Sequence, residues 1–136
     1  MSWQSIGAWS VLTAMVFAGC GDSLGLDTQE HLAGSWNWVE SSGGIAGVTL
    51  TPASTGETMT LRFPSAGLVE LIRNGAFVRS STYTLTPVLE EDSFGIEYEP
   101  PLLGFETQTG TLLRGDTLVL ADGCCDGFVY RWVRAR

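Results

Sequence analysis

The residue types that could support nucleophilic or metal chemistry are three cysteines and one histidine: Cys20, Cys124, Cys125 and His31. A nucleophilic cysteine or serine needs a base held against it, and His31 lies in a polar stretch ahead of the first predicted strand. No cluster of histidine, cysteine and carboxylate residues has the spacing of a metal site. The acidic run 90–92 precedes a predicted strand, where it is typical of a solvated turn. The sequence therefore predicts no catalytic residue, metal or cofactor, and we expect that the chain is not an enzyme.

The adjacent cysteines Cys124 and Cys125 lie in a glycine-containing loop, residues 122–127. In an oxidising compartment they could be joined, although their Cα atoms would lie only about 3.8 Å apart, below the usual range for a disulfide. Strain of that kind tends to mark function. Two interpretations stay open: a vicinal disulfide that stiffens the loop, or two small buried residues in a tight turn.

The formal net charge is −8, and residues 1–19 contain no Lys, Arg, Asp or Glu, so the whole imbalance belongs to the rest of the chain. A surface this acidic repels phosphate backbones, which argues against a nucleic-acid partner. It also gains nothing from anionic lipid headgroups. Any attachment to a membrane is therefore expected to be covalent or hydrophobic.

The N-terminus carries a mostly apolar run, residues 6–19, which is shorter than the roughly 20 residues that a membrane-spanning helix needs. Its length is typical of a secretory signal, and the alternative is a buried N-terminal helix. The run ends in Phe17-Ala18-Gly19-Cys20, which resembles the bacterial lipobox. That resemblance implies a signal peptide over 1–19, a lipid on Cys20 and a membrane-anchored tether over 20–33. Because Gly21 follows the cysteine, it also implies the outer membrane of the bacterial cell envelope.

Beyond the tether the sequence predicts strands and no convincing amphipathic helix. In residues 57–63, for example, Met59, Leu61 and Phe63 share one face. Asn74-Gly75 is the strongest short-range signal for a hairpin turn. We expect an all-β domain over 34–136, a roughly eight-stranded antiparallel up-and-down barrel, with a β-sandwich as the alternative. The predicted strands are 35–41, 57–63, 67–73, 76–86, 93–99, 105–113, 117–121 and 127–134.

One strand, 76–86, is inconsistent with simple alternation. The face that carries Phe77, Tyr83 and Leu85 also carries Arg79. Either a bulge lies near Ser80 and Ser81, or Arg79 points into the barrel as a polar contact for a ligand. We favour the bulge, because an unpaired buried charge is costly.

Gly34-Ser35-Trp36 matches the G-x-W that opens the first strand of lipocalins. In those proteins an arginine at the end of the last strand covers the tryptophan, and Arg134 is our choice for that role. Together with Asn74-Gly75 and the 122–127 loop, these residues resemble small bacterial lipocalin-like lipoproteins over about residues 34–136. The resemblance implies a lipocalin-like barrel in the cell envelope, and that family has no established activity.

Two functions follow, of which the first is favoured and the second is the alternative. The first is an anchored lipoprotein whose barrel binds a small apolar or amphipathic ligand. The second is a filled structural or interaction module with an unknown protein partner and an exposed apolar patch at Leu102, Leu103 and Phe105. An open cavity favours the first and a closed interior with an exposed 100–105 loop favours the second. The candidate lining residues are Trp38, Met59, Leu61, Phe63, Phe77, Tyr83, Phe94, Ile96 and Tyr98.

Overall fold

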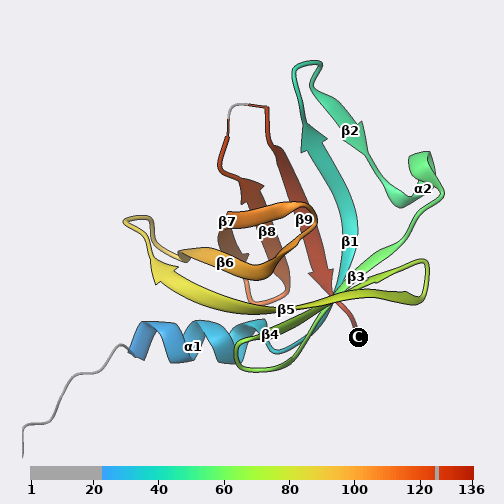
Figure 1. Ribbon diagram of the computed structural model, residues 1–136. Helices are drawn as coiled ribbons and strands as arrows, with labels where there is room; N and C mark the ends of the chain where they lie inside the picture. The colour runs from blue at the N-terminus through green and yellow to red at the C-terminus, as the bar shows by residue number, and fades with distance from the viewer. Residues whose placement is uncertain (1–22, 125) are drawn as a thin grey trace, which may run out of the picture.

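The protein is an antiparallel barrel in a computed structural model that describes residues 23–124 and 126–136, with side chains from residue 27 onward (Figure 1). Each strand pairs with the next one in the barrel, and the last strand returns to the first. The predicted closed eight-stranded antiparallel up-and-down barrel is confirmed. Its strands are β1 (Gly34–Gly43), β3 (Met59–Ser65), β4 (Leu68–Arg73), β5 (Ala76–Pro87), β6 (Ser93–Leu102), β7 (Phe105–Leu113), β8 (Thr117–Asp122) and β9 (Phe128–Arg134).

Alternation of side chains and the turn residues explain the strand pairing. In β3 the inward residues Met59, Leu61 and Phe63 are buried, as the two-residue period requires. Between β4 and β5 the chain turns at Asn74 and Gly75, whose φ angles are 51° and 77°. Two successive positive φ values suit a tight hairpin, and few residue pairs other than Asn-Gly adopt them readily.

β1 is the strand on which the barrel closes. Along one side it pairs with β9, from Trp36 opposite Arg134 to Gly43 opposite Phe128. On its other side its first half pairs with β3, and its last residues pair with the short strand β2 (Val48–Leu50). The hairpin of β1 and β2 stands out from the barrel in Figure 1. No sequence pattern predicted β2, because it has only three residues, all exposed or half-buried.

A single helical turn, α2 (Pro52–Thr55), joins β2 to β3. Thr51 is its N-cap, and its hydroxyl oxygen accepts a hydrogen bond from the amide of Ser54 at 3.1 Å. Pro52 occupies the first helical position, where its missing N–H costs nothing. Gly56 ends the turn in the left-handed conformation with φ 71°.

A ten-residue helix, α1 (Ser23–Leu32), lies across one end of the barrel below β5 (Figure 1). Its last residue, Leu32, is fully buried in the barrel core. The Trp36 indole N–H donates to the Leu32 carbonyl oxygen at 2.8 Å, which joins the helix end to β1. Most of the segment predicted as a polar tether is therefore helix in this structure. Within the described residues, no helix has the length and apolar character needed to span a membrane.

β6 continues through Pro100 and Pro101, beyond the predicted end of this strand at residue 99. The ladder with β7 is interrupted between Glu97 and Leu102 and resumes at the hairpin. Side chains of β5 bind the carbonyl oxygens that this interruption leaves: Ser81 Oγ donates to the Pro100 oxygen and Arg79 Nη1 to the Pro101 oxygen, both at 2.7 Å. The carbonyl oxygens of both prolines thus keep hydrogen-bond donors where the ladder with β7 is interrupted.

Candidate functional site

The barrel interior contains most of the residues predicted to line a ligand pocket. They pack in one core cluster that also includes Trp36, Leu118, Leu120 and Trp132. The members of the predicted lining that lie there are each 8% exposed or less. The structure therefore brings them together as packed core. They are Trp38, Met59, Leu61, Phe63, Tyr83, Phe94, Ile96 and Tyr98.

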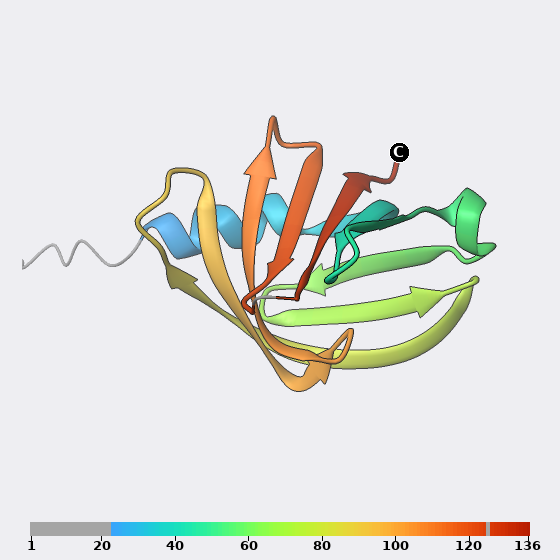
Figure 2. The ribbon, with the colours of Figure 1, turned by 90° about the horizontal axis from the view of Figure 1, so that it is seen from above.

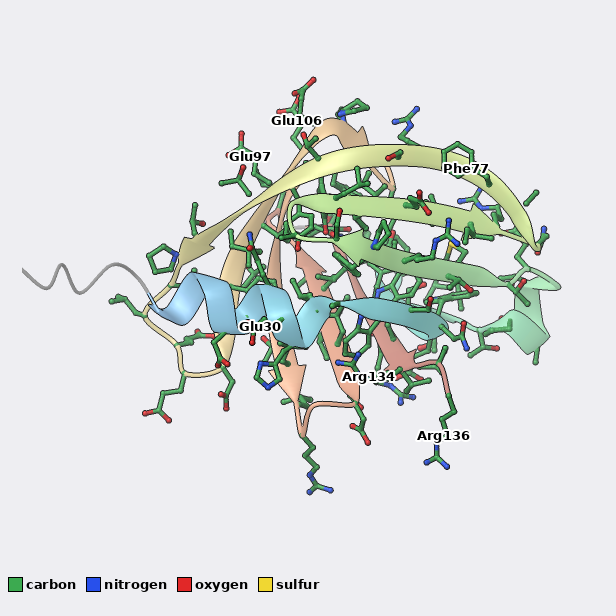
Figure 3. The ribbon with its side chains drawn as sticks, turned by 90° about the horizontal axis from the view of Figure 1, so that it is seen from below. Glu30, Phe77, Glu97, Glu106, Arg134 and Arg136 are labelled. Carbon is green, nitrogen blue, oxygen red and sulfur yellow. The ribbon has the colours of Figure 1, made fainter. Side chains whose placement is uncertain are left out.

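Phe77 is the exception, and its prediction as a lining residue is wrong. A register shift between β4 and β5 pairs Ile72 with Phe77 but Leu71 with Arg79, so Val78 is the extra residue of a bulge. The bulge lies a few residues before the predicted position. It moves Phe77 to the outer face, where it is 63% exposed (Figure 3). Arg79 shares the register of the buried Leu71, yet its side chain is exposed and binds the Pro101 carbonyl.

Large side chains occupy the interior of the barrel, beginning at the end that α1 crosses. Trp36 and Trp132 are fully buried, and Phe63 and Tyr98 are each 2% exposed. A Cβ atom added at Gly110 would lie 2.4 Å from the ring of Phe94, so the ring occupies the space that a side chain at 110 would need. An eight-stranded barrel encloses room for its own side chains or for one small ligand. Here the inward side chains are buried against one another in one cluster.

Arg134 covers the lower end of the core. Its guanidinium carbon lies 4.2 Å from the centre of the Trp36 ring, the pair of residues selected from the sequence. The same guanidinium donates to three carbonyl oxygens: His31 at 2.5 Å, Ala33 at 2.8 Å and Gly115 at 3.1 Å. His31 lies in the last turn of α1, Ala33 directly follows the helix, and Gly115 lies in the β7–β8 turn. A cation is favourable at a helix C-terminus, so Arg134 joins helix, turn and core (Figure 3).

The glycine of the G-x-W motif has a geometric cause. Gly34 has φ 114°, a conformation that other residues rarely adopt. A Cβ atom at this position would also lie 3.2 Å from Arg134 Nη1. Arg134 therefore lies against both the glycine and the tryptophan of the motif, over the Trp36 ring and close to the Cα of Gly34, where a larger residue would crowd it.

A polar chain crosses from β6 to β8 near the β8–β9 loop, and it was not predicted from the sequence. The Tyr98 hydroxyl donates to Gln108 Oε1 at 2.9 Å, and Gln108 Nε2 donates to Asp122 Oδ1 at 2.7 Å. The Phe128 amide donates to Asp122 Oδ2 at 2.9 Å, so the Asp122 carboxylate holds both ends of the loop. The one indication in the sequence was a glutamine, Gln108, at an inward-facing position of the predicted strand 105–113.

Burial changes the ionisation of the three tyrosines, Tyr83, Tyr98 and Tyr130. Burial raises the pKa of each phenol above its usual value. The Asp122 carboxylate raises the pKa of Tyr98 and Tyr130 further. Arg73 opposes the pKa shift at Tyr130. Tyr98 thus remains a neutral donor to Gln108 far into the alkaline range.

Three buried polar atoms have no hydrogen-bond partner among the described residues. They are the indole nitrogens of Trp38 and Trp132 and the hydroxyl oxygen of Tyr83. The two tryptophans are a cross-strand pair of β1 and β9. An unsatisfied buried N–H costs free energy that an acceptor would recover. The two indole N–H groups are therefore buried donors for which the described residues supply no acceptor.

The predicted apolar patch after the double proline is not exposed, so that prediction is wrong. Leu102 is fully buried, and Leu103 and Phe105 are half-buried. Leu103 packs against the core cluster. The exposed large apolar residues lie instead at Ile45, Val48, Phe77, Val78, Val88, Leu89, Leu113 and Val129.

A cleft of about 890 Å³ opens at the end of the barrel that α1 crosses. We call it the α1 cleft. One side is the helix face with Asp27, Thr28 and His31, and the other side is residues 85–94, which comprise the end of β5, the β5–β6 connection and the beginning of β6. The β7–β8 turn, through Leu112, Arg114 and Gly115, completes it. From the sequence, one flank is expected to be tether and the other a solvated turn, and only the fold brings them together.

Two predicted sites involve residues that the structure does not describe. Cys20 lies outside the described residues, and so does Cys125. Cys124 is exposed, and its carbonyl oxygen accepts a hydrogen bond from the Gly127 amide at 2.6 Å. The lipid on Cys20 and the bond between Cys124 and Cys125 therefore stay predictions.

No protein-family model, no curated protein and no solved structure matches the chain. Within residues 27–124 and 126–136, no three His, Cys, Asp or Glu side chains gather as metal ligands would. The function must therefore be inferred from the barrel interior and from its surface.

Proposed function

We propose that the chain is a lipid-anchored protein of the bacterial cell envelope whose barrel is a filled interaction module. The observation that carries this proposal is the packing of the predicted pocket residues into the core cluster. A barrel whose interior is occupied by its own side chains presents its outer surface and its loops to partners. The pairing of Trp36 with Arg134 supports a relation to small lipocalin-like lipoproteins.

Native mass spectrometry of residues 21–136, purified from a bacterial periplasm, tests the filled barrel. This segment holds every helix and strand that the structure describes. We expect the bare mass of the polypeptide, unchanged after incubation with fatty acids, phospholipids and sugars. A reproducible excess mass that is lost on denaturation would contradict the proposal and show an occupied pocket.

The lipid anchor is tested on the full chain by metabolic labelling with palmitate in a Gram-negative host. We expect label on the wild-type chain and none on Cys20→Ala, with the labelled protein in the outer-membrane fraction. Cys124→Ala is the matched control, because it removes a cysteine from the barrel and leaves the lipobox intact. An unlabelled wild type, or label that persists in Cys20→Ala, would contradict anchoring at this residue.

A second function, binding of a small apolar or amphipathic ligand inside the barrel, is favoured by one observation. The buried indole N–H groups of Trp38 and Trp132 have no acceptor among the described residues. A ligand with a carbonyl, carboxyl or hydroxyl oxygen would supply one. Its test is the NMR signal of these two indole N–H groups, which an entering ligand shifts and which a filled barrel leaves unchanged.

A further inference from the structure

The α1 cleft combines an apolar interior with exposed apolar residues at its edge. Among its apolar lining residues, Phe94 is buried and Leu85 and Leu112 are half-buried. At its edge Val88 is 39% exposed and Leu89 is fully exposed. Figure 2 shows the β5–β6 connection beside the beginning of α1. A fully exposed leucine next to a cleft with an apolar interior is an arrangement that partner binding would stabilise.

The charges around the α1 cleft are mainly negative. Its lining includes the carboxylates of Asp27, Glu90, Glu91 and Asp92, against one arginine, Arg114. His31 is also present, and its Nδ1 lies 2.8 Å from the Asp27 carbonyl oxygen. In the described part of the chain, no basic side chain lies within ion-pair distance of residues 90–92. These three carboxylates therefore present uncompensated charge at the edge of the apolar cleft.

We propose that the α1 cleft binds a cationic amphipathic segment of another envelope protein, in which a large apolar side chain lies between Lys or Arg residues. This inference rests on the proposed interaction function of the filled barrel. The apolar side chain would enter beside Leu89, and the flanking cations would face residues 90–92. Charge complementarity selects this partner, since anionic lipid and nucleic acid are both repelled by the same carboxylates.

Fluorescence anisotropy with a labelled peptide of alternating Lys and Leu tests the proposal on residues 21–136. We expect saturable binding that weakens as salt is added. Leu89→Ser should weaken binding about tenfold, through loss of apolar contact area. Glu90→Gln combined with Glu91→Gln should weaken binding and reduce its dependence on salt.

Matched control variants distinguish binding at the α1 cleft from nonspecific electrostatic or hydrophobic binding elsewhere on the surface. Ile45→Ser removes a side chain that is 91% exposed in the β1–β2 connection, away from α1. Glu97→Gln with Glu106→Gln removes two exposed carboxylates from strands β6 and β7, on the part of the surface away from Glu30 of α1 (Figure 3). Both controls should bind the peptide as the wild type does.

Several results would overturn the proposal. These are no binding of the cationic peptide, equal binding of a peptide with Glu in place of Lys, or equal losses in the control and cleft variants. Binding of zwitterionic vesicles that depends on Leu89, without binding of the peptide, would replace the protein partner with a lipid surface. If native mass spectrometry gives the mass of the polypeptide alone and the peptide does not bind, only the docking site is overturned. If it gives an excess mass, the filled barrel is overturned.

Discussion

Replacing Arg134 by alanine should destabilise the barrel and release α1 from it. The guanidinium donates to three carbonyl oxygens and stacks on Trp36. Because the side chain is only half-buried, we assign each hydrogen bond about 1 kcal/mol of net stability, the middle of the usual range. The stacking contributes about 0.5–1 kcal/mol at a site that water can reach. We therefore expect a loss of about 3.5–4 kcal/mol in the free energy of unfolding.

Arginine and lysine should differ at this position. Arg134→Lys keeps the charge but replaces a planar fork with a single ammonium group, which cannot stack on Trp36 and reach three carbonyls together. We expect about half the loss seen for alanine, roughly 2 kcal/mol. Arg136→Ala is the matched control, since it removes an exposed arginine two residues further along (Figure 3).

Urea unfolding of residues 21–136, followed by tryptophan fluorescence, measures these losses. Hydrogen exchange then locates them: amides of α1 should lose protection more than those of the central strands, because two of the three carbonyl partners lie at the end of the helix. If Arg134→Ala and Arg136→Ala agree within about 0.5 kcal/mol, the role assigned to Arg134 is refuted.

Three further predictions concern the core. Above about pH 10 the free energy of unfolding should fall, by up to about 1.4 kcal/mol per pH unit for each tyrosine, because the unfolded phenols ionise there while burial keeps the folded ones protonated. Urea titrations between about pH 9 and about pH 11 measure this fall. Gly110→Ala should cost about 2 kcal/mol through collision with Phe94, and Phe94→Leu in the same chain should restore part of it, as urea unfolding of the single and double variants would show. Phe77→Ser should change stability by less than about 0.5 kcal/mol, whereas Phe63→Ala should cost about 3–5 kcal/mol; equal effects in thermal unfolding would contradict the bulge.

The strands were predictable because most of them carry a two-residue hydrophobic period and end at residues with turn preferences. β3 and the Asn74-Gly75 turn are examples of such local signals. The closure of the barrel also had a signal, since Trp36 and Arg134 stand at the beginning of the first strand and the end of the last. Each of these inferences needed only neighbours in sequence or a pairing that the fold class itself implies.

The sequence did not allow prediction of the exact strand register or of contacts between residues far apart in the chain. The bulge at Val78 reverses the face of Phe77, and alternation alone cannot place such a shift. The polar chain from Tyr98 to Asp122 depends on which strands are neighbours. α1 has one buried apolar residue among its described side chains, Leu32, so its docking left no periodic pattern to detect. The α1 cleft combines two segments about sixty residues apart that each resemble solvated connections.

The pairing of β1 with β9 also determines when during synthesis the protein can fold. Glu40 and Arg131, an ion pair on neighbouring strands, are 91 residues apart in the chain. A nascent chain that ends before Phe128 has a sheet with two unpaired edges, β1 and β8, and such edges invite aggregation. The barrel can close only when its last residues have been delivered, and non-local closure of this kind is slow. A nonsense codon ahead of β9 is therefore expected to yield an open sheet and not a smaller barrel.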